Sequence, residues 1–196
     1  NGQTAVNNIS LNIERNSVYG LLGPNGAGKS TTIRTLMGLL KPTGGCASIF
    51  GLDCGQYAAE IAKDVGYLPS ENCYYNDLKV REMLQYTADL YGMDCNSRME
   101  ELAERLNLDL SRKIQDLSLG NKKKVGIVSA LLPSPKLLIM DEPTSGLDYG
   151  HMLEVSRRLR ELAEQGLCVV VITHDGEFLR ESGAWTADWL PNDKQP

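Results

Sequence analysis

A glycine-rich stretch near the N-terminus carries residue types that bind phosphate. Residues 23–30 read Gly-Pro-Asn-Gly-Ala-Gly-Lys-Ser, which fits the pattern G-x-x-x-x-G-K-[ST] in full. Glycines let the backbone wrap around phosphate groups, because no Cβ intervenes and positive φ angles are accessible. The N–H groups of residues 26–31 and the N-terminus of a following helix would then face negative charge. The predicted nucleotide-phosphate site consists of Gly23, Pro24, Asn25, Gly26, Ala27, Gly28, Lys29, Ser30 and Thr31.

Within this stretch, two side chains have distinct expected roles. Lys29 adds a positive charge at the outer phosphates, and the Ser30 hydroxyl can bind Mg²⁺. A flexible glycine-rich turn is the alternative interpretation. An apolar run before the stretch and a helical pattern after it provide the strand–turn–helix context that the phosphate site needs.

Two carboxylates follow a second apolar run. The run "KLLIM", residues 136–140, predicts a buried strand, and Asp141 and Glu142 come next. Side chains at the carboxyl end of a parallel strand face the ligand crevice. We expect Asp141 to hold Mg²⁺ directly or through water, and Glu142 to polarise a water in line with the γ-phosphate. A solvated Asp-Glu-Pro turn is the alternative, and the phosphate loop in the same chain favours the metal and base roles.

The two histidines are expected to differ in role. His174 ends a third apolar run, "LCVVVIT", at residues 167–173. It is therefore expected at the same sheet edge as Ser30 and Asp141, which favours a contact with the γ-phosphate over a purely structural role. His151 lies in a helical pattern beside polar residues, so we expect it to have a structural role.

A second candidate anion site starts at residue 117 with the sequence "LSLGNKKK". Ser118 and Gly120 begin a helical pattern, and a serine hydroxyl, a glycine N–H and a helix N-terminus together attract anions. A simple serine N-cap is the alternative, and it would explain Ser118 alone. The three lysines at 122–124 are interpreted as a mostly solvated first helical turn.

The elements that must position these residues alternate between strands and helices. Strands are predicted at 17–22, 46–50, 65–68, 136–140 and 167–173, and helices at 31–40, 58–63, 80–92, 98–106, 121–132 and 149–165. Continuous apolar strands separated by helices indicate an α/β fold with a mainly parallel sheet that is covered on both faces. The helix-only stretch 73–133 is expected to be a helical subdomain inserted into a single domain, 1–196. After Glu177 the pattern fades.

Composition excludes several function classes. The formal net charge of -5 over 196 residues argues against a dominant nucleic-acid surface. No window contains 18 consecutive apolar residues, and no signal peptide is expected at the N-terminus. The five cysteines form no C-x-x-C pair, so we expect reduced thiols and no cysteine-bound metal.

Together these motifs resemble those of the nucleotide-binding subunit of an ABC transporter, over nearly the whole chain. The resemblance rests on "GPNGAGKST" at 23–31, "LLIMDEP" at 137–143, "SGLD" at 145–148 and "ITHD" at 172–175, in the family's order. It implies a P-loop NTPase fold, ATP and Mg²⁺ as cofactors, and ATP hydrolysis with Glu142 as the catalytic base.

The resemblance also implies partners. In the family, two subunits pack head to tail, so that Ser118 and Gly120 would contact the ATP held by the phosphate loop of a second ABC ATPase subunit.

A transmembrane permease is the other implied partner, with the chain bound peripherally at the cytoplasmic face of the membrane. The helical subdomain and the loop 70–77, where Tyr74 and Tyr75 are expected to be exposed, would carry motion to the permease. Ordinary packing of the two tyrosines is the alternative. The sequence "LSLGNKKKVGIV" is similar to that of drug, bacteriocin or lantibiotic exporters, which implies export.

The sequence departs from the family pattern at several positions. The usual signature is Leu-Ser-Gly-Gly-Gln, whereas Leu119 and Asn121 stand here at the third and fifth places. Ser70 occupies the place of a usual glutamine after "GYLP", where Glu71 is a possible substitute. The family's adenine-stacking aromatic residue has no match.

Two other classes of protein are alternatives to a transporter subunit. Soluble ABC ATPases of DNA repair or of ribosomes usually carry long coiled coils, tandem ATP domains or basic tracts, and this acidic sequence has none. A binding module without hydrolysis would lack a base after the Mg²⁺ aspartate, whereas Glu142 is present. The resemblance implies that the permease, and not this chain, selects the cargo.

Overall fold

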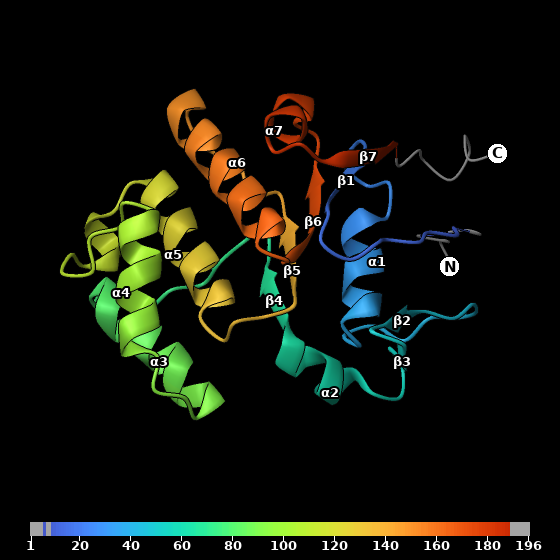
Figure 1. The fold of residues 1–196 in the computed structure, drawn as a ribbon, viewed down its shortest axis with the longest axis horizontal. Coiled ribbons are helices and arrows are strands. Elements are labelled where there is room, and N and C mark those ends of the chain that lie inside the picture. The colour runs from blue at the N-terminus through green and yellow to red at the C-terminus, as the bar shows by residue number, and fades with distance from the viewer. Residues whose placement is uncertain (1–5, 7–8, 189–196) are drawn as a thin grey trace.

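Five parallel strands form the centre of the computed structural model, which describes residue 6 and residues 9–188 (Figure 1). The strand order is β4-β5-β6-β1-β7, and every neighbouring pair is parallel. The carboxyl ends of all five strands therefore lie at one edge of the sheet. The strands are β1 (Val18–Leu22), β4 (Val65–Leu68), β5 (Leu137–Asp141), β6 (Cys168–Thr173) and β7 (Trp185–Asp188).

Helices and a small hairpin connect these strands. Strands β2 (Ser48–Ile49) and β3 (Leu52–Asp53) form the antiparallel hairpin. The helices are α1 (Lys29–Leu36), α2 (Ala58–Ile61), η1 (Ala62–Asp64), α3 (Val80–Tyr91), α4 (Asn96–Arg105), η2 (Ile114–Asp116), α5 (Leu119–Leu131), α6 (Tyr149–Glu164) and α7 (Gly176–Glu181). Within the described part of the chain, no helix is both long and apolar enough to cross a membrane.

Each face of the sheet buries alternate strand residues into its own hydrophobic core. In β5, Leu137 and Ile139 lie in one core, whereas Leu138 and Met140 lie in the other, because successive side chains of a strand point to opposite faces. The first core includes residues of α1, α2 and the hairpin, and the second includes residues of α3 to α7. The prediction of a mainly parallel sheet covered on both faces is therefore confirmed, with α1 and α5 on opposite faces (Figure 1).

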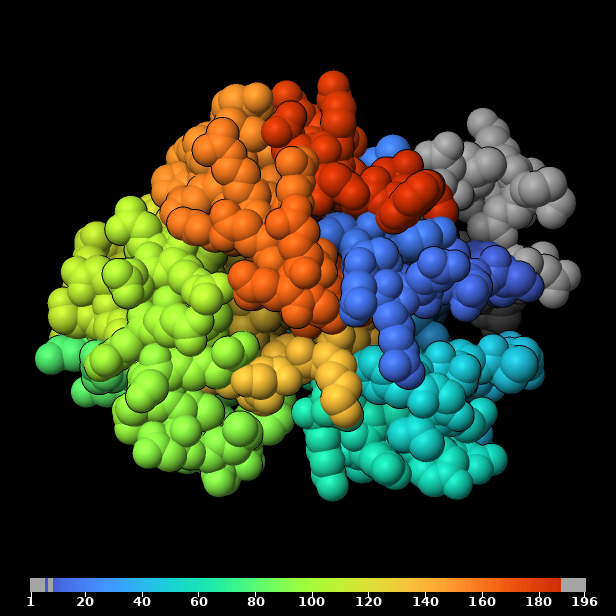
Figure 2. Space-filling view, in the orientation of Figure 1, coloured from blue at the N-terminus to red at the C-terminus, as the bar shows by residue number. Residues whose placement is uncertain are grey.

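The chain between β4 and β5 folds into α3, α4, η2 and α5, as the helix-only stretch predicted. It forms the green-to-yellow lobe at one end of the molecule (Figure 2). This lobe shares its hydrophobic core with one face of the sheet. Helix α5 lies so close to β4 that a Cβ on Gly66 would come within 2.2 Å of the carbonyl oxygen of Ala130. Glycine is required there because a main-chain group fills the space of a side chain.

Several predicted boundaries were wrong. Helix α1 begins at Lys29, two residues before the predicted start, and ends at Leu36 instead of Leu40. It ends there because Gly38 adopts a φ of 70°, and the N–H groups of Leu39 and Leu40 turn back to the carbonyl of Arg34. The strand predicted at 46–50 is reduced to the two residues of β2.

The expectation that the pattern fades after Glu177 was wrong, because the chain there forms helix α7 and strand β7. Asp175 caps α7 by accepting hydrogen bonds from the N–H groups of Glu177 and Phe178, and Phe178 and Leu179 are fully buried. Strand β7 then pairs with β1 at the edge of the sheet. Periodicity missed both elements because α7 has only six residues and β7 is a short edge strand.

Candidate nucleotide site

The glycine-rich loop connects the carboxyl end of β1 to the N-terminus of α1, as the sequence predicted. Gly26 and Gly28 adopt φ angles of 83° and 91°, a conformation that favours glycine. A Cβ on Gly26 would meet no atom within 4 Å, so its backbone conformation rather than crowding requires glycine there. Ser30 and Thr31 lie in the first turn of α1, where main-chain N–H groups are free of helical partners. The loop and helix N-terminus are therefore suited to bind an anion.

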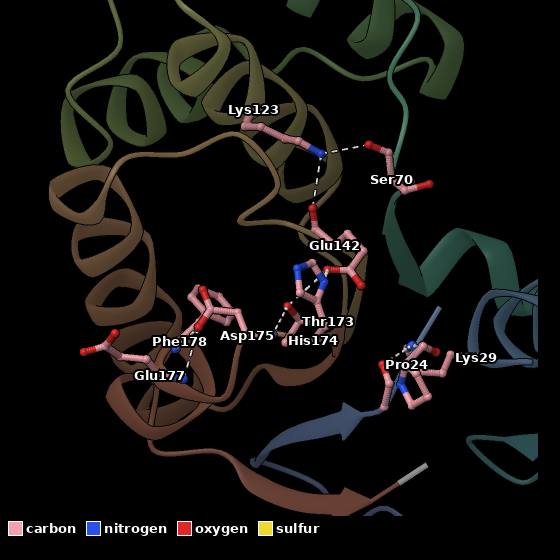
Figure 3. A network of polar contacts seen from close by, with 11 residues as sticks. Pro24, Lys29, Ser70, Lys123, Glu142, Thr173, His174, Asp175, Glu177 and Phe178 are labelled. Carbon is pink, nitrogen blue, oxygen red and sulfur yellow. Dashed lines mark hydrogen bonds and ion pairs between the residues drawn. The ribbon is translucent and has the colours of Figure 1, made fainter. Parts of the chain in front are cut away.

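Lys29 is buried at the base of this loop. Its Nζ donates hydrogen bonds to the carbonyl oxygens of Gly23, at 2.6 Å, and Pro24, at 2.9 Å (Figure 3). Desolvation lowers the pKa of Lys29, and attraction to Glu142 and Asp141 opposes this shift. The lysine thus places a positive charge between the phosphate loop and the two acids.

Asp141 ends β5 with a buried carboxylate that is only 1% exposed. Burial raises the pKa of Asp141, and the nearby Ser30 hydroxyl lowers it. Among the described residues, however, neither carboxylate oxygen has a hydrogen-bond partner of adequate geometry. A buried carboxylate without such partners is costly unless a cation or another polar group compensates it.

Asp141 and Ser30 fit the oxygen ligands of a Mg²⁺ site. Mg²⁺ is usually held by one or two carboxylates together with water and substrate phosphates, rather than by a cage of protein groups alone. In residues 6 and 9–188, no group of three His, Cys, Asp or Glu side chains is arranged to hold a metal. A site of this kind would therefore need phosphate oxygens in addition to the protein ligands.

Glu142 and His174 are brought together from β5 and β6. Glu142 Oε2 lies 3.0 Å from His174 Nδ1 and accepts a hydrogen bond of 3.2 Å from the Thr173 hydroxyl (Figure 3). Glu142 adopts a φ of 50°, which is unusual for a residue other than glycine. Its N–H donates to the carbonyl of Ile172 at 2.8 Å, so the main chain turns while it is still paired to β6. Sequence reasoning missed Thr173, which supports the Glu142 carboxylate.

The lysines after the second candidate site are not a solvated turn, so that prediction was wrong. Lys123 and Lys124 are only 6% and 2% exposed. Lys124 forms an ion pair of 2.7 Å with Glu154 of α6, and Lys123 donates to the carbonyl oxygens of Ser70 and Glu142. Both lysines are buried because α5 is enclosed by β4, α3, α4 and α6, an arrangement that local spacing cannot reveal.

Ser118 and Gly120 lie at the start of α5, away from the face of the sheet that α1 covers. Ser118 is exposed and caps α5 by accepting a hydrogen bond of 3.3 Å from the N–H of Asn121. Gly120 is buried, and a Cβ there would lie 3.4 Å from side-chain atoms of Leu147 and His151. The start of α5 therefore packs against the "SGLD" segment of its own chain. The cap hydrogen bond agrees with the simple N-cap interpretation.

The two adjacent tyrosines differ in exposure. Tyr75 is 60% exposed, as predicted, and its ring packs edge-on against Tyr86 at a centroid distance of 5.9 Å. For Tyr74 the exposed interpretation was wrong, and the packing alternative is correct. Its hydroxyl donates a hydrogen bond of 2.7 Å to the carbonyl of Lys122, and burial raises the pKa of Tyr74.

A parallel sheet with this phosphate loop at the end of β1 and two adjacent acids at the end of β5 defines the P-loop NTPase fold class, as predicted. The sequence profile of the ABC transporter family matches residues 6–145, and the chain belongs to this family. The resemblance stated from the motifs is therefore confirmed.

Two bacterial ATP-binding proteins are similar to this chain in sequence. The bacitracin transport ATP-binding protein BcrA of Bacillus licheniformis is 38% identical over 175 residues, which cover 88% of this chain and 57% of BcrA. The linearmycin resistance ATP-binding protein LnrL of Bacillus subtilis is 35% identical over 185 residues, which cover 90% of this chain and 60% of LnrL. The chain thus spans less than two thirds of the length of these relatives.

Solved structures share the fold. The ATP-binding subunit of an ABC transporter superposes with a TM-score of 0.81 and 31% identity, covering 92% of this chain and 77% of that one. The dimeric structure of MJ0796, a bacterial ABC transporter cassette, gives a TM-score of 0.84 and 25% identity, covering 96% of this chain and 88% of that one.

Proposed function

We propose that this chain is the ATP-binding and hydrolysing part of an ABC transporter that drives transport through a separate membrane permease. The observation that carries the proposal is the buried carboxylate of Asp141, without a good hydrogen-bond partner, next to Glu142 and opposite Lys29. The relatives named for bacitracin transport and linearmycin resistance support export of drug-like molecules.

In the proposed reaction, the phosphate loop and the N-terminus of α1 bind the triphosphate. The Lys29 ammonium, now shared between two loop carbonyls, would donate to the outer phosphate oxygens. Ser30 and Asp141 would hold Mg²⁺, which neutralises charge on the phosphates when it is bound. Glu142 would accept the proton of the attacking water, with its carboxylate held by Thr173 and His174. The Glu142 side chain is only 15% exposed, and partial removal from water strengthens these contacts.

We propose that two copies, or this chain and a related subunit, close head to tail around ATP. Exposed Ser118 and the N-terminus of α5 would then contact the γ-phosphate held by the partner's loop. The dimeric form of the similar cassette MJ0796 supports this arrangement. Hydrolysis would remove the phosphate that both subunits bind. The closed dimer would then no longer be favoured over the open one, and it would open.

The helical lobe would correspond to the inserted subdomain 73–133, and it would bind the permease at the cytoplasmic face of the membrane. Tyr86 and Leu90 are four residues apart on α3 and so share a helical face, and they are 45% and 70% exposed. Tyr75 packs against Tyr86 and extends this apolar surface. Adjacent exposed apolar side chains of this size commonly mark protein interaction sites.

ATP binding is tested by replacing Lys29. The variant Lys29→Ala removes a buried positive charge from the phosphate site and should weaken Mg-ATP binding at least about tenfold, since a charge-assisted hydrogen bond contributes about 1.5–3 kcal/mol. Isothermal titration with Mg-ATP measures the affinity. The control Lys41→Ala removes an exposed lysine after α1 and should bind ATP like the wild type. Unchanged affinity in Lys29→Ala would contradict the phosphate-loop assignment.

Permease docking is tested at the apolar surface of α3. Replacing Tyr75 and Leu90 together by serine should reduce recovery of the chain with a multispanning membrane protein at least about tenfold, because buried apolar anchors contribute most interface energy. This recovery is measured by copurification from the membranes of cells that coexpress the permease encoded by the neighbouring gene. Tyr57→Ser alters an exposed tyrosine on the other side of the sheet and should have no effect. Equal recovery of both variants would count against docking through α3.

A further inference from the structure

The segment after β4 is attached to α5 by contacts at residues 70–74 and 122–126, which we call the α5 seam. Lys123 Nζ donates to the carbonyl oxygen of Ser70 at 2.8 Å, and the Tyr74 hydroxyl donates to the carbonyl of Lys122 at 2.7 Å. A Cβ on Gly126 would lie 2.7 Å from the Tyr74 hydroxyl oxygen. Glycine costs stability inside a helix, and here it permits this close approach. The seam is therefore a packed contact and not a loose loop.

Lys123 extends the seam to Glu142, the proposed catalytic base. The same Nζ donates to the main-chain carbonyl of Glu142 at 3.3 Å (Figure 3), and that carbonyl also accepts the N–H of Ser145. One buried ammonium group thus joins α5, the segment after β4 and the turn after β5. Its direct partners are carbonyl groups, so its contacts hold main-chain positions and not merely side chains.

The charges around Lys123 agree with this role. Desolvation lowers the pKa of Lys123, whereas Asp141 and Glu142 raise it. The same two acids act on Lys29 from the phosphate loop. Asp141 and Glu142 therefore lie in the fields of two buried lysines, one on each side of the sheet. Loss of Lys123 would leave the Glu142 turn without its anchor to the helical lobe.

We propose that Lys123 is a positioning residue, which aligns the Glu142 carboxylate only while the segment after β4 is docked on α5. The proposal rests on the proposed ATPase function. Glu142 holds an unusual φ, and such a conformation persists only where surrounding contacts maintain it. Ser70 and the exposed Tyr75 belong to the same segment after β4. Movement of this segment by a bound partner would therefore be transmitted through Lys123 to the main chain of Glu142.

The variant Lys123→Met tests the proposal, since methionine keeps an unbranched buried side chain and removes the donors. The kcat for Mg-ATP should fall about 10- to 100-fold, because small misplacement of a catalytic group is costly, while the Kd for Mg-ATP stays within about threefold. Amide hydrogen exchange should accelerate at 70–72 and at Ser145. The matched control Lys124→Met removes the next buried lysine, which pairs with Glu154. It should lower the melting temperature and leave kcat within about twofold at a temperature where it is folded.

The outcomes test the positioning role of Lys123 separately from the proposed ATPase function. A wild-type kcat with unchanged exchange at 70–72 and Ser145 in folded Lys123→Met would overturn the positioning role. Equal loss of kcat in Lys124→Met would also overturn it, because a general structural effect would then suffice. If the wild-type chain shows no hydrolysis, the proposed function fails, and the exchange measurement still decides whether Lys123 holds the Glu142 turn. Should Lys123→Met not fold, Lys123→Gln keeps one donor group, and its kcat must then fall at least about fivefold.

Discussion

Replacing Glu142 by glutamine is expected to lower the rate of ATP hydrolysis by about 10²- to 10⁴-fold, the usual contribution of a positioned general base. Glutamine keeps the size of the side chain and an oxygen that can accept from the Thr173 hydroxyl. It cannot accept the proton of an attacking water at neutral pH. Lys29 and Asp141 are unchanged, so Mg-ATP binding should persist and the ATP-bound dimer should accumulate.

Steady-state phosphate release, isothermal titration and size-exclusion chromatography with Mg-ATP measure these three properties. Glu177→Gln is the matched control, because this exposed carboxylate on α7 hydrogen-bonds to Tyr149, outside the catalytic group. The control should retain the wild-type rate. Hydrolysis by Glu142→Gln at a near wild-type rate would show that Glu142 is not the base.

The second large effect is expected for Ser118→Arg. If Ser118 serves the ATP of a second subunit, the monomer's affinity for ATP should be nearly unchanged, whereas ATP-driven dimerisation and hydrolysis should be abolished. A bulky arginine would occupy the place where the partner's γ-phosphate meets the N-terminus of α5. Gln165→Arg makes the same change at an exposed position at the end of α6 and should leave hydrolysis intact.

Mixing Ser118→Arg with Lys29→Ala distinguishes action within one subunit from action across the dimer. If Ser118 contacts the ATP bound by the other subunit, a mixed dimer contains one composite site with both substitutions and one composite site with neither. Hydrolysis should then return to at most about half of the wild-type rate per mixed dimer, when one intact site suffices. If Ser118 acts within its own subunit, every site keeps one lesion and no activity returns. Loss of ATP affinity in monomeric Ser118→Arg, with an unchanged circular dichroism spectrum, would overturn the arrangement across the dimer.

Local patterns in the sequence determined the class of fold and the residues of the candidate nucleotide site. The phosphate loop is read from contiguous residues, because the backbone conformation that binds phosphate requires glycines at fixed spacing. Asp141, Glu142 and His174 were placed at one edge because parallel strands end there together. The spacing of Met152, Val155 and Leu159 predicted one buried face of α6, and all three are buried.

Contacts between distant segments were decided only by the tertiary structure. The run of Lys122, Lys123 and Lys124 has the composition of a solvated turn, yet two of these side chains are buried. Lys124 is compensated by Glu154, 30 residues away, and Lys123 by the carbonyl of Ser70, 53 residues away. A buried charge is tolerated only where such partners meet it. Hydrophobic periodicity reports which face of an element is buried, whereas the partner of a buried polar group depends on how the elements pack.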